Sequence, residues 1–160
     1  MEQKNWDYTF LHGPHFYEVS IVVKDLEATL EQFRCLFGMT PYLIRDEKIR
    51  DFQLHGKKVT QARIKFAFFH AGPIRLELLQ PVEGESVWME FLREKGTGIH
   101  SIVCRVSDLD SELAQLEKRG IRVSQRIEAP RANLKIALLD TEDVAGVSFE
   151  LAQSEGMPGE

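Results

Sequence analysis

Three glutamates occupy single polar positions within apolar segments of the sequence. Glu77 lies in residues 76–80 (LELLQ), and Glu150 lies in the similar residues 149–153 (FELAQ) 73 positions later; Glu18 lies in a third apolar segment. Carboxyl groups that share a partly dry site raise one another's pKa, so they either hold protons or are neutralised by a cation. Carboxylate oxygens suit Mg²⁺ or Mn²⁺, and they also suit Zn²⁺ or Co²⁺ sites with open positions. Glu18, Glu77 and Glu150 are therefore candidate ligands of a divalent metal ion that would polarise a carbonyl as a Lewis acid.

Arginines are the alternative partners of these carboxylates. Arg75 has the strand parity of Glu77, and Arg105 has the strand parity of Ser101. In this second interpretation, each glutamate forms an ion pair with an arginine and binds no metal.

An internal duplication indicates how these side chains are positioned. Residues 17–26 (YEVSIVVKDL) recur in loose form as residues 100–109 (HSIVCRVSDL), at an offset of 83 residues. Each copy leads directly into a helical pattern, for which Asp25 and Asp108 are the expected N-caps. Each half of the chain therefore begins with an apolar strand and ends with a strand that carries one glutamate.

The order of elements in each half is strand, helix, strands. The expected strands cover residues 16–24, 41–45, 52–69 with a basic turn at 56–58, 74–80, 100–106, 122–127, 135–140 and 147–153. The domain organisation follows as an N-terminal arm at 1–15, a first module at 16–81, a linker with a short helix at 82–98, a second module at 99–153 and a tail at 154–160. Neither module can bury its sheet alone, so we predict an α+β fold in which two βαβββ modules form a cupped mixed sheet with helices outside.

Strand alternation predicts which side chains face the hollow of the cup. If Val19 and Ile21 pack under the first helix, Glu18 points the other way. The same alternation sends four further polar side chains to the hollow, namely those of Glu77, Ser101, Arg105 and Glu150.

Composition and charge exclude some classes of function. A net charge of −5 and a pI near 5.6 disfavour a nucleic-acid partner, since phosphate binding needs a concentrated basic surface. No apolar run approaches the roughly 18 residues of a membrane span, and the N-terminal residues lack the pattern of a signal peptide. Cys35 and Cys104 show no metal or redox spacing and are consistent with a reducing compartment. We expect a cytoplasmic protein with a small-molecule substrate.

Four segments resemble the vicinal oxygen chelate superfamily, and within it the methylmalonyl-CoA epimerase branch. They are VSIVVKDLEATLEQFRCLFGM, IRLELLQP, FLREKGTGIHSIVCRVSDLDSELAQLEKRGIRV and LLDTEDVAGVSFEL, which follow the motifs of that branch in order over about residues 16–152. The resemblance implies a fold of two βαβββ modules and a site for a divalent metal ion such as Co, Zn, Mn or Mg.

The resemblance also implies a role for individual positions. Glu77 matches the second metal ligand of the epimerases, and Glu150 matches the last ligand. Glu18 and Ser101 stand where a histidine is usual, and His100 lies one residue early, where alternation turns it into the core. Metal binding through Glu18, Glu77 and Glu150 is thus expected with two of the four usual positions changed.

The function that this resemblance implies is an epimerase-like isomerase that acts on an acyl-CoA or a related 2-substituted acid. A metal-stabilised enolate would form while Glu150 or Glu18 moves the proton. Ser101, Arg75 and Arg105 are the candidate substrate-binding residues. The alternatives are a non-catalytic small-ligand binder, of the antibiotic-sequestering type, and a glyoxalase I-like lyase. Members of the superfamily often dimerise, so a homodimer is compatible with this interpretation.

Overall fold

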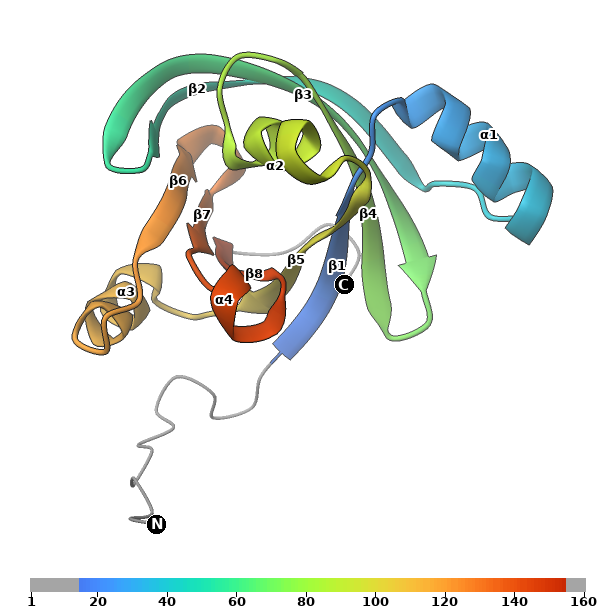
Figure 1. Ribbon diagram of the computed structural model, residues 1–160. Helices are drawn as coiled ribbons and strands as arrows, with labels where there is room; N and C mark the ends of the chain where they lie inside the picture. The colour runs from blue at the N-terminus through green and yellow to red at the C-terminus, as the bar shows by residue number, and fades with distance from the viewer. Residues whose placement is uncertain (1–14, 155–160) are drawn as a thin grey trace.

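The computed structural model describes residues 15–154, and within them the two halves of the duplication build one eight-stranded barrel (Figure 1). The first half supplies β1 (His15–Val22), α1 (Leu26–Phe37), β2 (Leu43–Leu54), β3 (Lys57–Ala71) and β4 (Ile74–Glu83). The second half supplies β5 (Gly98–Arg105), α3 (Leu109–Glu117), β6 (Val123–Ala129), β7 (Leu134–Leu139) and β8 (Ser148–Ser154). The halves are joined by α2 (Val87–Lys95), and the second also contains the 3₁₀ turn η2 (Pro130–Ala132) and the short α4 (Glu142–Ala145). The predicted α+β fold of two βαβββ modules is confirmed.

The two modules repeat the same strand order. Around the barrel the strands run β1-β4-β3-β2-β6-β7-β8-β5, so that each module contributes four neighbouring strands. β1 pairs in parallel with β4, and β5 pairs in parallel with β8. The modules meet through the antiparallel pair of β1 and β5, while Gln53 and Leu54 of β2 pair with β6 on the other side. The last strand of each module therefore lies beside its first, as a site built from these strands requires.

Equivalent capping bonds fix the start of the first helix in each module. The side chain of Asp25 accepts a hydrogen bond from the backbone N–H of Ala28, at 3.0 Å, and Asp108 caps α3 in the same way. The glutamine that ends each repeated glutamate segment adds a second bond. Gln80 accepts from the N–H at the start of α1, and Gln153 does so at the start of α3. These bonds satisfy helix N–H groups that have no partner within the helix, and they tie each helix to the strand that carries the glutamate.

Three apolar clusters hold the layers together. One lies between α1 and the sheet and includes Val23, Leu26 and Phe69, and a second lies between α3 and the sheet and includes Leu109 and Leu151. The third fills one end of the barrel interior, where α2 packs against the strands (Figure 1). Its core residues include Val22, Phe52, Leu79, Trp88, Phe91 and Leu138.

Some local predictions need correction. Residues 46–51 lie between two of the expected strands, but β2 runs through them, since the whole strand pairs with β3 and its charged side chains reach solvent. Leu36 and Phe37 continue the apolar helical period that predicts a face packed against the sheet, yet they are 73% and 64% exposed at the end of α1. The connection between the expected strands at 135–140 and 147–153 contains α4.

Two predicted segments fall almost entirely outside the described residues, namely the arm at 1–15 and the tail at 154–160. No helix among residues 15–154 is long and apolar enough to cross a membrane.

Candidate active site

The interior of the barrel contains one polar layer, built by the strands that join the two modules. Strand pairing places Ser20 opposite both Glu77 of β4 and Ser101 of β5. One pair further along β1, Glu18 lies opposite Arg75. Because paired residues project to the same side of a sheet, these side chains share the inner face, as strand alternation predicted.

Glu150 joins this layer from β8. Its pairing partner on β5 is Val103, which in turn lies opposite Glu18 on β1. Glu18 and Glu150 are buried, with 4% and 7% of their surfaces exposed, whereas Glu77 keeps partial access to solvent. The three predicted glutamates thus lie on β1, β4 and β8, which together with β5 are four neighbouring strands of the barrel.

Each module supplies a serine that donates a hydrogen bond to its own glutamate. The Ser20 hydroxyl donates to Glu77 at 2.6 Å, and the Ser101 hydroxyl donates to Glu150 at 3.3 Å. Sequence reasoning singled out Ser101 but missed Ser20. The parity of Ser20, two residues after Glu18, was the signal that could have revealed it.

Burial and mutual repulsion raise the pKa of two of the carboxyl groups. Burial, followed by the charge of Glu18, raises the pKa of Glu77 to about 8. The pKa of Glu150 is raised well above its ordinary value by burial and then by the charges of Glu18 and Glu77. The charge of Glu18 contributes to both shifts, and the charge of Glu77 contributes to that of Glu150, so the three groups form one electrostatic cluster.

Glu18 differs from the other two because it has a cationic partner. The Nε and Nη2 atoms of Arg75 both contact its carboxylate. Burial raises the pKa of Glu18 above its ordinary value, and the charge of Arg75 and its hydrogen bond oppose this rise. Glu18 is therefore the member of the cluster that is best able to carry the negative charge.

Aromatic rings enclose the guanidinium of Arg75. Its central carbon lies 4.1 Å from the ring centroid of Phe68 and 5.3 Å from that of Tyr17. The Arg75 side chain is 15% exposed. The interpretation in which an arginine neutralises the glutamates therefore applies to Glu18.

Tyr17 and Arg105 lie next to this pair. The Arg105 guanidinium lies 5.2 Å from the centroid of the Tyr17 ring, so the ring contacts both arginines. Strict alternation would have turned Tyr17 away from Glu18. A register shift in the pairing of β1 with β5, between Phe16 and Glu18, changes this, and sequence reasoning missed Tyr17 because the pattern does not reveal a bulge.

His100 lies away from the carboxyl cluster. Its ring packs edge-on against Phe91 of α2, with 5.1 Å between the centroids, and only 2% of the residue is exposed. Burial lowers its pKa to about 4, so the ring is neutral at neutral pH. The pairing of β5 with β1 does shift register here, but the shift does not bring His100 to the glutamates. The expected role as a buried core residue is confirmed.

The residues of this layer do not fit a divalent metal ion as they are arranged. Within residues 15–154, no group of three or more histidine, cysteine, aspartate or glutamate side chains is placed to hold one. Glu18 is bonded to a guanidinium, which would repel a metal ion beside it. Glu77 and Glu150 favour the protonated form, whereas a metal ligand must be deprotonated. Metal dependence therefore stays a prediction from resemblance.

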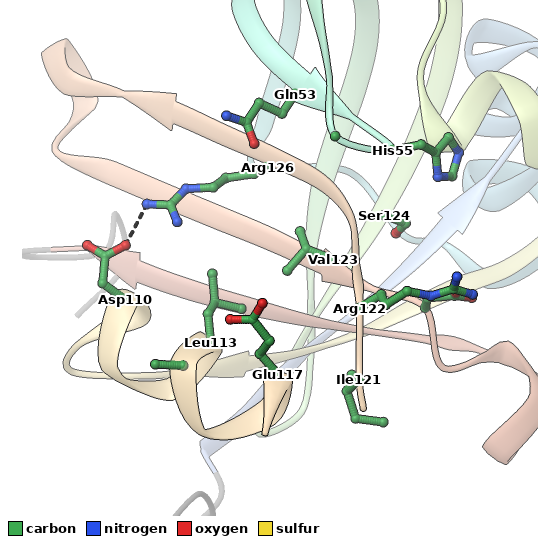
Figure 2. A pocket seen from close by; sticks show the side chains of 13 residues that line it. Gln53, His55, Asp110, Leu113, Glu117, Ile121, Arg122, Val123, Ser124 and Arg126 are labelled. Carbon is green, nitrogen blue, oxygen red and sulfur yellow. Dashed lines mark hydrogen bonds and ion pairs between the residues drawn. The ribbon is translucent and has the colours of Figure 1, made fainter. Parts of the chain in front are cut away.

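Two surface hollows lie elsewhere. The first, of about 720 Å³, lies between α3 and the strands β2 and β6, and its arginines have acidic partners (Figure 2). Arg126 contacts Asp110 at 2.6 Å, and Arg122 contacts Asp140 at 2.8 Å. The second, of about 370 Å³, adjoins α2 and α4. Neither is lined by the three glutamates, so the polar layer of the barrel remains the stronger candidate for chemistry.

Comparison with known proteins matches the chain to one protein superfamily and to two curated relatives. The chain matches the model of the Glyoxalase/Bleomycin resistance protein/Dioxygenase superfamily over residues 17–138. It is 33% identical to the uncharacterized protein YqjC of Bacillus subtilis over 104 residues, which are 64% of this chain and 74% of that protein. It is 26% identical to the mitochondrial methylmalonyl-CoA epimerase of Homo sapiens over 138 residues, which are 85% of this chain and 72% of that protein.

A solved structure agrees with this result. The methylmalonyl-CoA epimerase of Mycobacterium tuberculosis superimposes with a TM-score of 0.62 and 26% sequence identity. The superposition covers 88% of this chain and 87% of that protein. The fold and the sequence thus point to the same set of relatives.

Proposed function

The chain belongs to the glyoxalase, bleomycin resistance protein and dioxygenase superfamily, and from this premise we propose that it is an epimerase-like isomerase of an acyl-CoA or a similar 2-substituted acid derivative. Two observations support the substrate class: the 26% identity to the human methylmalonyl-CoA epimerase and the superposition on the mycobacterial one. The observation that carries the proposal is the pair of buried carboxyl groups, Glu18 and Glu150, because Glu18 is bonded to a guanidinium while Glu150 is bonded to a serine hydroxyl.

Inversion of an acidic carbon needs one base and one acid. In the proposed reaction the Glu18 carboxylate accepts the α-proton, and the electron pair of the broken C–H bond moves toward the thioester carbonyl to form an enolate. Protonated Glu150 then donates its proton to the other face of the same carbon. The enolate is consumed, the stereocentre is inverted, and the two carboxyl groups have exchanged protonation states. The reverse reaction uses the same groups in the opposite roles, as an isomerase requires.

Other residues of the layer have supporting roles in this proposal. Ser101 orients Glu150 through its hydrogen bond. Arg105, which lies beside Tyr17, is suited to receive the free carboxylate of the substrate. Glu77, protonated and bonded to Ser20, adds a neutral hydrogen-bond donor instead of a third negative charge.

The test is exchange of the α-proton of methylmalonyl-CoA in deuterated water, followed by proton NMR. We expect the wild-type protein to catalyse the exchange and Glu150→Gln to lower kcat by about 100-fold or more, since general acid–base groups contribute about 10²- to 10⁴-fold. A matched control is Glu83→Gln, which changes an exposed glutamate of the same strand as Glu77. Absence of exchange with chelated protein and with every added divalent metal would reject the isomerase.

A small-ligand binder is the second candidate function, and the ion pair of Glu18 with Arg75 favours it. A carboxylate that is already neutralised is a weaker base. A binder would bind the acyl-CoA tightly in calorimetry and leave its α-proton in place. Deuterium exchange with a glutathione thiohemiacetal as the substrate tests the third candidate, a glyoxalase I-like lyase.

A further inference from the structure

We propose that Arg75 is the resident cation of this site and that its guanidinium, in place of a bound metal ion, stabilises the charge of the enolate. The inference rests on the proposed isomerase function and concerns the same polar layer. It assigns to a side chain the electrophilic role that the sequence pattern alone suggested for a divalent ion.

The position of Arg75 carries the first step. Arg75 stands on β4 two residues before Glu77 and directly opposite Glu18 on β1, so it projects into the layer that holds the carboxyl groups. Its guanidinium is held between the rings of Phe68 and Tyr17. Electrostatic interactions are stronger in such a site than in water, because neighbouring side chains replace much of the solvent.

The hydrogen-bonding capacity of Arg75 carries the second step. A guanidinium has five N–H donors in a planar fork. The contacts with Glu18 come from Nε and Nη2, which leaves the Nη1 side of the fork outside this ion pair. Tyr42 also forms a hydrogen bond with the Arg75 side chain, so a thioester oxygen would accept from an N–H of the fork that neither Glu18 nor Tyr42 occupies, while the bond to Glu18 remains.

Charge balance during the reaction carries the third step. Before proton transfer, the positive charge of Arg75 is matched by the Glu18 carboxylate. When the α-proton moves to Glu18, that carboxyl becomes neutral, and the negative charge appears on the enolate oxygen. Arg75 then has one anionic partner before and after the step, so the site gains no unpaired charge.

The experiment compares metal binding and turnover in three proteins after exhaustive treatment with a chelator. They are the wild type, Arg75→Gln, and the control Arg63→Gln. Arg63 is a suitable control because it lies on the neighbouring strand β3 and forms its own two-bond pair with Asp46 near the surface. Calorimetric titration with Mn²⁺ and Co²⁺ measures binding, and deuterium exchange of methylmalonyl-CoA measures kcat and KM.

We expect chelated wild type and Arg63→Gln to exchange the α-proton at rates that added Mn²⁺ or Co²⁺ changes by less than about twofold. Arg75→Gln should lose about 10²- to 10³-fold in kcat, the range for removal of one oxyanion donor, with a smaller change in KM. The wild type should bind neither ion, while Arg75→Gln, which frees the carboxylates, should gain binding. If Arg75→Gln does not fold, Arg75→Lys should retain the charge, lose the fork and lower kcat by about tenfold.

The outcomes separate this inference from the isomerase function. Exchange that stops on chelation and returns with one bound metal ion would overturn the role of Arg75 and leave the isomerase in place. Absence of exchange under all conditions would reject the isomerase. If no exchange is seen, the metal titrations still test whether Arg75 is the resident cation of the site. Binding of Mn²⁺ or Co²⁺ by the wild type would overturn that claim, and binding by Arg75→Gln alone would support it.

Discussion

Arg75 on β4 bonds through its guanidinium to the carboxylate of Glu18, its direct partner on the parallel neighbouring strand β1. Both side chains lie inside the barrel, with 15% and 5% exposure. This ion pair makes Glu18 differ from the two other glutamates of the polar layer, Glu77 and Glu150. It thereby creates the asymmetry between base and acid on which the proposed reaction depends.

The first prediction concerns stability. Arg75→Gln leaves Glu18 as an uncompensated buried charge, so we expect a loss of about 3–5 kcal/mol in the free energy of unfolding at neutral pH. The double variant Arg75→Gln, Glu18→Gln should recover most of this loss, because it buries no charge. Urea unfolding curves of the two variants provide the measurement. Equal losses in both variants would show that packing of the guanidinium, and not its charge, accounts for the effect.

The second prediction concerns pH. The pKa of Glu77 rises from an ordinary value of 4.5 to about 8 in the folded protein. The folded state therefore binds a proton that the unfolded state releases, and this contribution is fully present below about pH 4.5 and is lost as the pH rises to about 8. Stability should fall across that interval in the wild type and fall less in Glu77→Gln. Chemical unfolding at pH 5 and pH 8 measures this change in the free energy of unfolding. An equal change in the wild type and in Glu77→Gln would contradict the raised pKa of Glu77.

The third prediction concerns Ser101. Its hydrogen bond opposes the rise in the pKa of Glu150. Ser101→Ala should therefore raise that pKa further, so the limb of the pH–rate profile that reports the acid should move to higher pH. Ser20→Ala, which removes the equivalent bond to Glu77, is the control and should leave that limb in place. A profile that moves equally in both variants would argue against Glu150 as the acid.

The fourth prediction concerns His100. The ring is buried against Phe91, and its Nδ1 atom has no hydrogen-bond partner in the described part of the chain. His100→Leu, which is similar in volume and removes no bond at Nδ1, should change stability by less than about 1.5 kcal/mol. Turnover should stay within about threefold of wild type, since the ring lies outside the carboxyl layer. A large loss of kcat in a folded variant would instead place His100 in the site.

The repeated segments predicted the fold and the inner face of the barrel from sequence. Two features made this possible: the 83-residue duplication and strict strand alternation, which together assigned Glu18, Glu77, Ser101 and Glu150 to one face. Alternation states which side of a sheet a residue occupies, but it does not choose among partners on that side. The bond of Arg75 to Glu18, its partner in the pairing of β1 with β4, follows from strand register, which the sequence pattern did not reveal.

The misses have local physical causes. Tyr17 was missed because a register shift in the first strand breaks the alternation on which the prediction relied. Residues 46–51 separate two of the predicted strands, but they lie in a single strand whose long pairing with β3 leaves polar side chains in solvent. Leu36 and Phe37 follow the helical period, yet they are exposed, because the period does not indicate where the covering sheet ends.

The most direct test of the account is deuterium exchange at the α-carbon of methylmalonyl-CoA with chelated wild-type protein. The account predicts that the α-proton signal decays at the same rate with and without added divalent metal, and that Glu18→Gln and Glu150→Gln each slow the decay by about 100-fold or more while the protein stays folded. Persistence of the signal with folded wild type, whether or not divalent metal is added, would contradict the claim that this carboxyl layer moves a proton.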